Sequence, residues 1–319
     1  RRCWGGRRAL VRNGHRHSAF RVFLQVTFGL ELLRSGPVLD VAGGKGVLSW
    51  ELVNCAGVEE AVVVDPRPLD TRYLNRKWRK GKFEPRSTGP VFSKWFPAVK
   101  AGDGSSRDPL DPLHCRVFFS AAETLRLLSC DDPAETDSWF SKETERGRRV
   151  CWSTKGLEEG HEEKETAGNS YRCACCCCYD KSLASQEEDS AEGPRGVGEG
   201  AASAELTSER ELTSADQALS VFNRAVLVAG MHPDQAAGEV AEFAIARRLP
   251  WAVVPCCVYG REFPQRKLPD GRRVSTYEDL IEWLRGRHPG TRTTGLDFEG
   301  RNICIYMLPE DYNLGACLA

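Results

Sequence analysis

Gly43, Gly44 and Gly46 stand close together between a short apolar run and a stretch of helix-forming residues. Glycine lets the backbone approach a ligand closely, and the first N–H groups of a following helix attract negative charge. Asp40 stands just before these glycines, where its carboxylate can pair with an ammonium group of a ligand. Residues 40–46, which we call the glycine loop, are therefore predicted to bind a nucleotide-like cofactor.

A second acidic residue, Asp65, ends the next apolar run of the chain. It follows Gly46 by about 20 residues, the spacing at which a carboxylate accepts hydrogen bonds from the hydroxyls of a bound ribose. A dinucleotide fingerprint aligned on Gly44 and Gly46 places Ser49 where a third glycine is expected, so that fit is incomplete. A dinucleotide also offers no ammonium group to Asp40. These residues favour S-adenosylmethionine over a nicotinamide cofactor.

The residues around the glycine loop have the pattern of a β-α-β unit. Two short apolar runs, 38–39 and 61–65, flank a helical pattern at 47–56. The runs lack polar alternation, as is typical of parallel strands buried on both faces. Another helix is expected at 22–33, before the first strand. The second half of the chain predicts strands at 225–230 and 251–255, helices at 235–248 and after a capping box at 275–278, and a terminal β-hairpin of 296–298 with 303–308.

The segment Val38-Leu39-Asp40-Val41-Ala42-Gly43-Gly44-Lys45-Gly46 resembles motif I of the class I methyltransferases, with Ala42 in place of the usual first glycine. The similarity covers roughly residues 15–80 and 220–310, where the chain resembles a group of largely uncharacterised eukaryotic methyltransferase-domain proteins. The further segments that carry it are His17-Ser18-Ala19-Phe20, Thr27-Phe28-Gly29, Val64-Asp65-Pro66-Arg67-Pro68, Gly230-Met231-His232-Pro233-Asp234-Gln235-Ala236 and Val253-Val254-Pro255-Cys256-Cys257.

This resemblance implies an α/β, Rossmann-like fold: a seven-stranded, mostly parallel sheet with helices on both faces and an antiparallel C-terminal hairpin. It also implies a methyltransferase that binds S-adenosylmethionine at the carboxyl ends of the strands. A more distant similarity, at 230–232 and 255–257, is to the 2′-O-methyltransferase that modifies the tRNA acceptor stem. RNA is therefore one candidate methyl acceptor. The positions that match the cofactor motifs are Asp40, Ala42, Gly43, Gly44, Gly46, Asp65 and Pro66.

The residues after the fourth and fifth expected strands are the candidates for contact with the methyl acceptor. His232 is expected to take a proton from a hydroxyl or amine of the acceptor, and Asp234 to orient His232 or contact the substrate. Asp234 has an equally good alternative role as the cap of the following helix. The residues expected to line the substrate pocket are Met231, Pro255, Cys256 and Cys257.

Composition divides the chain into five segments. Residues 131–214 are rich in charge and glycine and cannot supply a core, so they are expected to form a disordered insertion. The cysteine tract at 173–178 within them lacks the paired spacing of a zinc site, and no metal site is predicted. The other segments are a helical lead-in at 1–36, the two parts of the methyltransferase domain at 37–130 and 215–310, and a tail at 311–319.

Charge and hydropathy limit the partners of the chain. The 44 basic and 45 acidic residues nearly cancel, so the chain as a whole does not attract nucleic acid or an anionic membrane. A basic and aromatic region, 67–115, has two interpretations, a solvated surface or a nucleic-acid contact. No apolar run reaches the roughly 20 residues of a membrane span.

The 14 cysteines, without a visible secretory signal, favour a reducing intracellular location, cytoplasmic rather than nuclear or organellar. The Arg-rich start could alternatively be an organelle-targeting presequence. Two other functions stay open. These are a nicotinamide-dependent oxidoreductase and a non-catalytic protein that binds the cofactor and other proteins.

Overall fold

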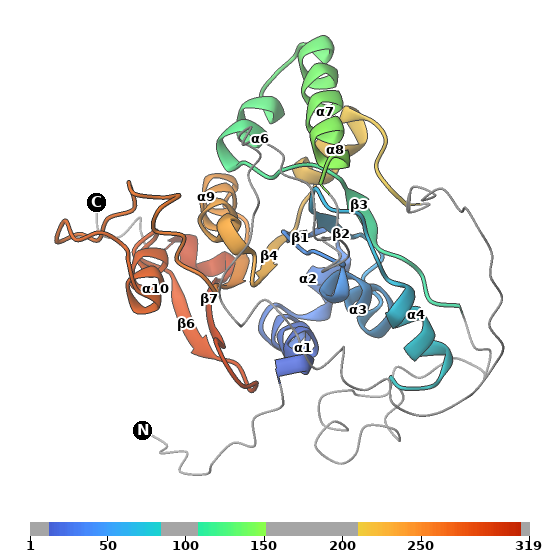
Figure 1. Cartoon of the computed structure of the whole chain (residues 1–319), viewed down its shortest axis with the longest axis horizontal. Helices are drawn as coiled ribbons and strands as arrows, with labels where there is room; N and C mark the ends of the chain where they lie inside the picture. Colours follow the sequence, from blue (N-terminus) through green and yellow to red (C-terminus); the bar gives the residue numbers. More distant parts are fainter. Residues whose placement is uncertain (1–12, 84–107, 151–209, 314–319) are drawn as a thin grey trace, which may run out of the picture.

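The computed structural model describes residues 13–83, 108–150 and 210–313. Its centre is one seven-stranded sheet with the strand order β3-β2-β1-β4-β5-β7-β6 (Figure 1). The expected strands at 38–39, 61–65, 225–230 and 251–255 are all present, within two residues at each end. The strands are β1 (Val38–Val41), β2 (Ala61–Val64), β3 (Leu113–Cys115), β4 (Leu227–Met231), β5 (Trp251–Val254), β6 (Arg292–Gly295) and β7 (Ile303–Met307).

The five strands β1 to β5 run parallel to one another, whereas β6 and β7 form an antiparallel pair. β1 pairs in parallel with β2 on one side and with β4 on the other, and β7 runs antiparallel to both β5 and β6. All residues of β1, β2, β4 and β5 are buried, which explains their continuous apolar sequences. The predicted α/β, Rossmann-like sheet with an antiparallel C-terminal hairpin is confirmed.

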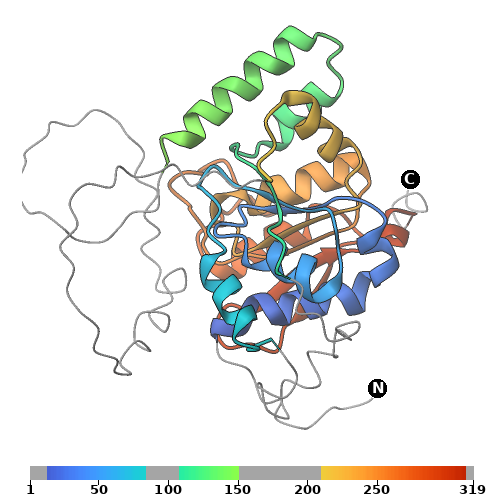
Figure 2. The same ribbon diagram turned by 90° about the vertical axis from the view of Figure 1, so that its right-hand side faces the viewer.

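Helices cover both faces of the sheet. In Figure 2, α1 (Arg16–Phe28) lies on one side of it, and α8 and α9 lie on the other. Phe20, Leu24 and Leu48 belong to the core on the first face, while Phe222 and Phe243 belong to the core on the second. The other helices are α2 (Leu30–Arg34), α3 (Val47–Ala56), α4 (Arg72–Arg79), α6 (Ala121–Leu128), α7 (Pro133–Arg148), α8 (Ala215–Asn223), α9 (Ala237–Arg247) and α10 (Tyr277–Arg285). None of the helices within the described residues is long and apolar enough to cross a membrane.

The prediction of a disordered insertion over 131–214 is wrong at both ends. Residues 133–148 form α7, which Asp132 caps by accepting a hydrogen bond from the N–H of Ala134. Trp139 and Phe140 of α7 are buried in the same core as residues of α8. A narrow apolar stripe of this kind is hidden in sequence by the charged residues around it. Residues 151–209, with the cysteine tract at 173–178, lie outside the described residues.

Residues 210–212 are the second ordered part of this region. They run beside β3, where the N–H of His114 donates to the carbonyl of Arg210 and the N–H of Leu212 donates to the carbonyl of His114. They therefore cover the edge of the sheet that β3 would otherwise expose. β3 itself is absent from the sequence prediction, because it is short and has a polar residue, His114, at its centre.

Two other sequence predictions need correction. The helix expected at 22–33 is interrupted at Gly29, whose positive φ of 80° separates α1 from α2. The first strand of the hairpin, expected at 296–298, is β6 at 292–295 instead. The side chain of Asn302 donates to the carbonyls of Leu296 and Phe298 and so holds these residues in a loop. We call residues 296–302 the β6–β7 loop.

Replacing Trp139 by alanine tests whether α7 belongs to the folded domain. Trp139 is 7% exposed, and we expect Trp139→Ala to lower the free energy of unfolding by about 3 kcal/mol in urea titration, because a buried ring is lost. The exposed Lys142 of the same helix is the matched control, and Lys142→Ala should change this free energy by less than about 0.5 kcal/mol. Equal stability of both variants would show that α7 does not pack on the domain.

Candidate functional site

The loops after β1, β2, β4 and β5 all lie at one edge of the sheet, because these strands are parallel. β1 lies between β2 and β4, so successive connections leave it in opposite directions, and ligands bind at such a switch point in open α/β sheets. Backbone strain also gathers at this edge. Five non-glycine residues of the described chain have a positive φ. Four of them lie in these loops: Ala42, His232, Asp234 and Tyr259. The fifth, Arg248, ends α9.

The glycine loop connects β1 to α3. Gly44 and Gly46 have φ values of 58° and 77°, a region that favours glycine. A Cβ on Gly46 would lie 2.4 Å from Leu69 Cδ1, and one on Gly43 would lie 2.6 Å from Asp40 Oδ2. Ala42, which replaces the first glycine of the motif, has a φ of 54° and so adopts the left-handed conformation that glycine would adopt there.

Asp40 is buried at the end of β1, with 1% of its surface exposed. Its Oδ2 accepts a hydrogen bond from the hydroxyl of Ser49 at 3.0 Å, whereas Oδ1 has no hydrogen-bond partner among the described residues. Burial raises the pKa of Asp40 to about 7, although the hydrogen bonds from Ser49 oppose this shift. No ion pair joins this carboxylate to a basic side chain of the described residues, so no nearby positive charge offsets the effect of burial.

Asp65 lies at the end of β2 and is held by several donors. The backbone N–H of Gly44 donates to its Oδ2 at 2.9 Å, which ties the glycine loop to β2. The guanidinium of Arg67 donates from Nε to Oδ1 at 2.9 Å and from Nη2 to Oδ2 at 2.7 Å. The spacing of Asp65 in the sequence predicts that its carboxylate binds ribose hydroxyls. In the structure Arg67 occupies both of its oxygens.

The charge of Arg67 also interacts with residues that follow β4 and β5. Burial alone would lower the pKa of Arg67, but the hydrogen bonds and charge of Asp65, with further contributions from Asp234 and Tyr259, raise it above its ordinary value. Asp234 follows β4 and Tyr259 follows β5. Arg67 therefore extends from the end of β2 toward the ends of β4 and β5, across the end of β1.

His232 follows β4, and the β6–β7 loop holds its ring. The ring Nε2 lies 3.0 Å from the carbonyl oxygen of Arg301, and Phe298 packs edge-on against it with 6.2 Å between centroids. A carbonyl oxygen only accepts hydrogen bonds, so Nε2 carries the proton and Nδ1 carries the lone pair. This tautomer gives His232 a basic nitrogen.

His17 of α1 lies close enough to His232 for their charges to interact. Burial lowers the pKa of His17 well below its usual value, and the charges of Arg16 and His232 lower it further. A protonated His17 is therefore disfavoured beside His232. In the sequence His17 belongs to a matching motif and has no predicted role.

Asp234, Cys256 and Cys257 meet beside His232. The Sγ of Cys256 lies 3.9 Å from Oδ1 of Asp234 and 3.2 Å from the Sγ of Cys257. The helix-cap interpretation of Asp234 is wrong, since the N-cap of α9 is Ala236 and no side chain caps this helix. We call His232, Asp234, Cys256 and Cys257 the acceptor edge.

The other predicted site residues lie next to these groups. Met231 and Pro255 are buried at the ends of β4 and β5, and Pro66 is half-buried between Asp65 and Arg67. No group of three or more His, Cys, Asp or Glu side chains in the described part of the chain is placed to hold a metal ion. Two residues of the site have no role predicted from sequence: Ser49, which fits a dinucleotide fingerprint poorly, and Arg67, which stands beside Asp65 in a motif.

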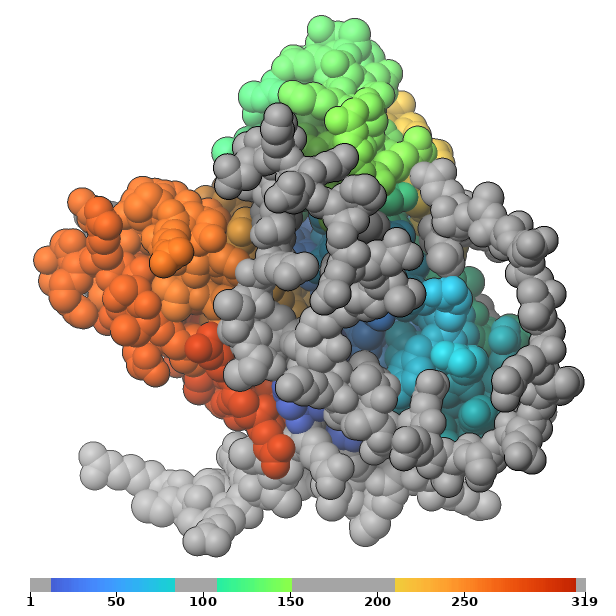
Figure 3. Space-filling model, in the orientation of Figure 1, coloured from blue at the N-terminus to red at the C-terminus, as the bar shows by residue number. Residues whose placement is uncertain are grey.

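Only some side chains of the basic and aromatic region, 67–115, are exposed in the described part of the chain. Trp78 and Phe83 pack against Trp50, with ring centroids 5.7 and 5.0 Å from it, so these rings are partly covered. Lys77 lies over the ring of Tyr73, which is 40% exposed. Figure 3 shows α4 on the surface, on the opposite side from the α9–α10 region. Phe92, Trp95 and Phe96 lie outside the described residues.

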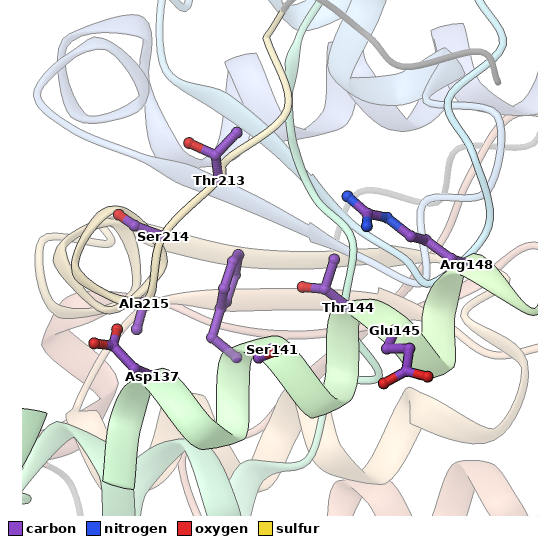
Figure 4. A pocket seen from close by; sticks show the side chains of 9 residues that line it. Asp137, Ser141, Thr144, Glu145, Arg148, Thr213, Ser214 and Ala215 are labelled. Carbon is purple, nitrogen blue, oxygen red and sulfur yellow. The ribbon is translucent and has the colours of Figure 1, made fainter. Parts of the chain in front are cut away.

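A cavity of about 540 Å³ lies away from this edge, between α7 and the start of α8. Figure 4 shows Asp137, Ser141 and Arg148 on α7, with Thr213 and Ser214 across from the helix. None of the predicted site residues lines it. This cavity does not coincide with the switch point of the sheet.

Comparisons of the chain with protein-family models, with curated proteins and with solved structures found no significant match.

The pKa of Asp40 makes the stability of the protein depend on pH. Its folded value of about 7 lies above the ordinary value of 3.8, so the protonated form favours folding, and this contribution is lost as the pH rises toward 7. We expect the free energy of unfolding of Asp40→Asn to exceed that of the wild type by more at pH 8 than at pH 5. Chemical denaturation at both pH values measures the difference. A difference that is the same at both would contradict the assignment.

Proposed function

We propose that this protein is an S-adenosylmethionine-dependent methyltransferase. The observation that carries the proposal is the buried, cation-free carboxylate of Asp40 beside the glycine loop, with Oδ1 unpartnered among the described residues. The ammonium group of the cofactor's methionine part would complete it. The antiparallel β7 adds support, because it departs from the sheet of ordinary dinucleotide-binding domains.

The residues of the glycine loop fit this cofactor. The absence of side chains at Gly43, Gly44 and Gly46 lets the backbone approach the ligand, and Asp65 can accept hydrogen bonds from ribose hydroxyls once Arg67 moves aside. When bound, the cofactor supplies an electrophilic methyl group. Holding that group against the acceptor is the main task of the protein, since alignment removes much of the entropic barrier.

At the acceptor edge, His232 is the candidate general base. The bond between Nε2 and the carbonyl of Arg301 leaves Nδ1, which is buried in this structure, as the nitrogen that would take a proton from the acceptor hydroxyl or amine. Asp234 orients the acceptor, and Cys256 and Cys257 form the wall of the pocket. RNA, tRNA in particular, is the acceptor class we favour, and the exposed cations of α4 support it.

Two measurements test the proposal. Calorimetric titration of the full chain should show binding of S-adenosylmethionine and S-adenosylhomocysteine, and no comparable binding of NADH or NADPH. Transfer of a radiolabelled methyl group to separated RNA, protein and small-molecule fractions should then label RNA. Binding of NADH or NADPH alone would favour an oxidoreductase. Cofactor binding with no label in any fraction would favour a non-catalytic protein, and label confined to protein or small molecules would exclude RNA.

Replacing His232 by asparagine separates catalysis from folding. Asparagine tolerates the positive φ of 54° at this position, so the loop should keep its shape. We expect the rate of methyl transfer to fall about 100-fold or more, since a general base is lost, with unchanged affinity for S-adenosylhomocysteine. The control is His288→Asn, because His288 packs on Tyr312 outside the acceptor edge. Full activity of His232→Asn would remove His232 from the mechanism.

Replacing Arg67 by alanine distinguishes the two cofactor classes. Arg67 competes with a ribose for Asp65, so Arg67→Ala should tighten S-adenosylhomocysteine binding by about fivefold, the equivalent of one partly exposed ion pair. An NADPH-binding protein would respond in the opposite way, because an arginine at this position contacts the 2′-phosphate. Arg72→Ala, which removes the exposed ion pair with Asp70, is the matched control and should leave the dissociation constant unchanged.

A further inference from the structure

A cluster of charged and aromatic side chains lies beside the acceptor edge, between α9, α10 and the loop after β5. It lines a cavity of about 380 Å³. Phe263 and Arg266 come from the loop that begins at Cys256 and Cys257, and Nη2 of Arg266 donates to the carbonyl of Gln235, 3.4 Å away. Gln235 directly follows Asp234. The segments that form the acceptor edge therefore also form this cavity.

Arg266 is the central residue of the cavity. Its side chain packs between two rings, with Cζ 3.6 Å from the centroid of Phe263 and 4.8 Å from that of Trp283. Only 7% of the residue is exposed. The bond to Gln235 is its single side-chain hydrogen bond to the described residues, although a guanidinium has five N–H donors. Burial lowers the pKa of Arg266 to about 10.

The other charged groups of the cavity leave it with an excess of positive charge. Two of them are carboxylates, and both already have partners. Glu239 accepts a hydrogen bond from the N–H of Ala121 at 2.7 Å, and Glu242 pairs with Arg287 at 2.6 Å. Lys267 is exposed at the rim. Three cations therefore line the cavity with two engaged carboxylates.

A glycine keeps the cavity open at the first turn of α9. A Cβ on Gly238 would lie 3.0 Å from Cη2 of Trp283 and 3.2 Å from Nη2 of Arg266. No side chain caps this helix end, so its positive dipole end adds to the attraction for an anion.

We propose that this cavity binds a phosphate group of the methyl acceptor, with Arg266 and Lys267 as its donors. That the ligand is the acceptor rests on the proposed function, whereas the binding of phosphate does not. A guanidinium packed between aromatic rings loses little side-chain freedom on binding, and its N–H groups form a fork that matches phosphate oxygens. Arginine side chains already lie over the rings of Phe263 and Trp283, so these contacts compete with base stacking and favour the backbone of a nucleic acid.

The first experiment needs no cofactor. The thermal unfolding midpoint of the full chain is measured in phosphate, acetate and chloride at equal ionic strength, and phosphate alone should raise it. Lys267→Ala should weaken phosphate binding about tenfold, the equivalent of one charge-assisted hydrogen bond, and Arg266→Gln should abolish it. Arg261→Ala is the matched control, since Arg261 is an exposed arginine of the same loop that does not line the cavity.

Acetate as effective as phosphate, or phosphate binding unchanged in Lys267→Ala, would overturn the assignment even if Arg266→Gln fails to fold. The second experiment compares kinetics with a phosphate-bearing acceptor, for which Lys267→Ala should raise KM about tenfold and leave kcat unchanged. Phosphate binding without any methyl transfer would reject the proposed function and keep the phosphate site. Methyl transfer with an unchanged KM in Lys267→Ala would keep the proposed function and reject this cavity as part of the acceptor site.

Discussion

The parallel pairing of β1 with both β2 and β4 is the constraint on which the candidate site depends. This pairing places the carboxyl ends of three buried strands side by side. It brings together residues that are far apart in the chain, with Asp40 and Asp65 on one side and His232 and Asp234 on the other. The hydrogen bond from the N–H of Gly44 to Asp65 then fixes the glycine loop to the neighbouring strand. Without that sheet order, none of these side chains would share a site.

The two buried carboxylates of the site, Asp40 and Asp65, differ in their partners. Asp40 is buried and has no cationic partner within the described part of the chain, whereas both oxygens of Asp65 accept hydrogen bonds from Arg67. A ligand with a positive group and a ribose would neutralise the first carboxylate and displace the arginine from the second. The strained residues Ala42, His232 and Asp234 surround the same position. The surrounding sheet must hold such conformations in place, which is common where a protein binds or reacts with a ligand.

The antiparallel C-terminal hairpin has a structural consequence for the proposed chemistry. Because β7 runs opposite to β5, the β6–β7 loop returns to the edge at which the parallel strands end. There Arg301 and Phe298 hold the ring of His232. The loop after β5 contributes Cys256 and Cys257 to the acceptor edge, and it contributes Phe263 and Arg266 to the neighbouring cavity.

Local periodicity and glycine spacing in the sequence were enough to predict the β-α-β unit, the glycine loop and four of the buried strands, because these are properties of neighbouring residues. The sequence did not reveal α7, whose narrow apolar stripe at Trp139 and Phe140 is buried only by contact with α8. It predicted that Asp65 binds a ribose, and it indicated no role for Arg67. The pairing of Arg67 with Asp65, the absence of a cap at Asp234 and the contact of His232 Nε2 with the carbonyl of Arg301 appear only in the three-dimensional structure. Each of these depends on which side chains or carbonyls come together when distant segments fold, and one-dimensional spacing does not contain that information.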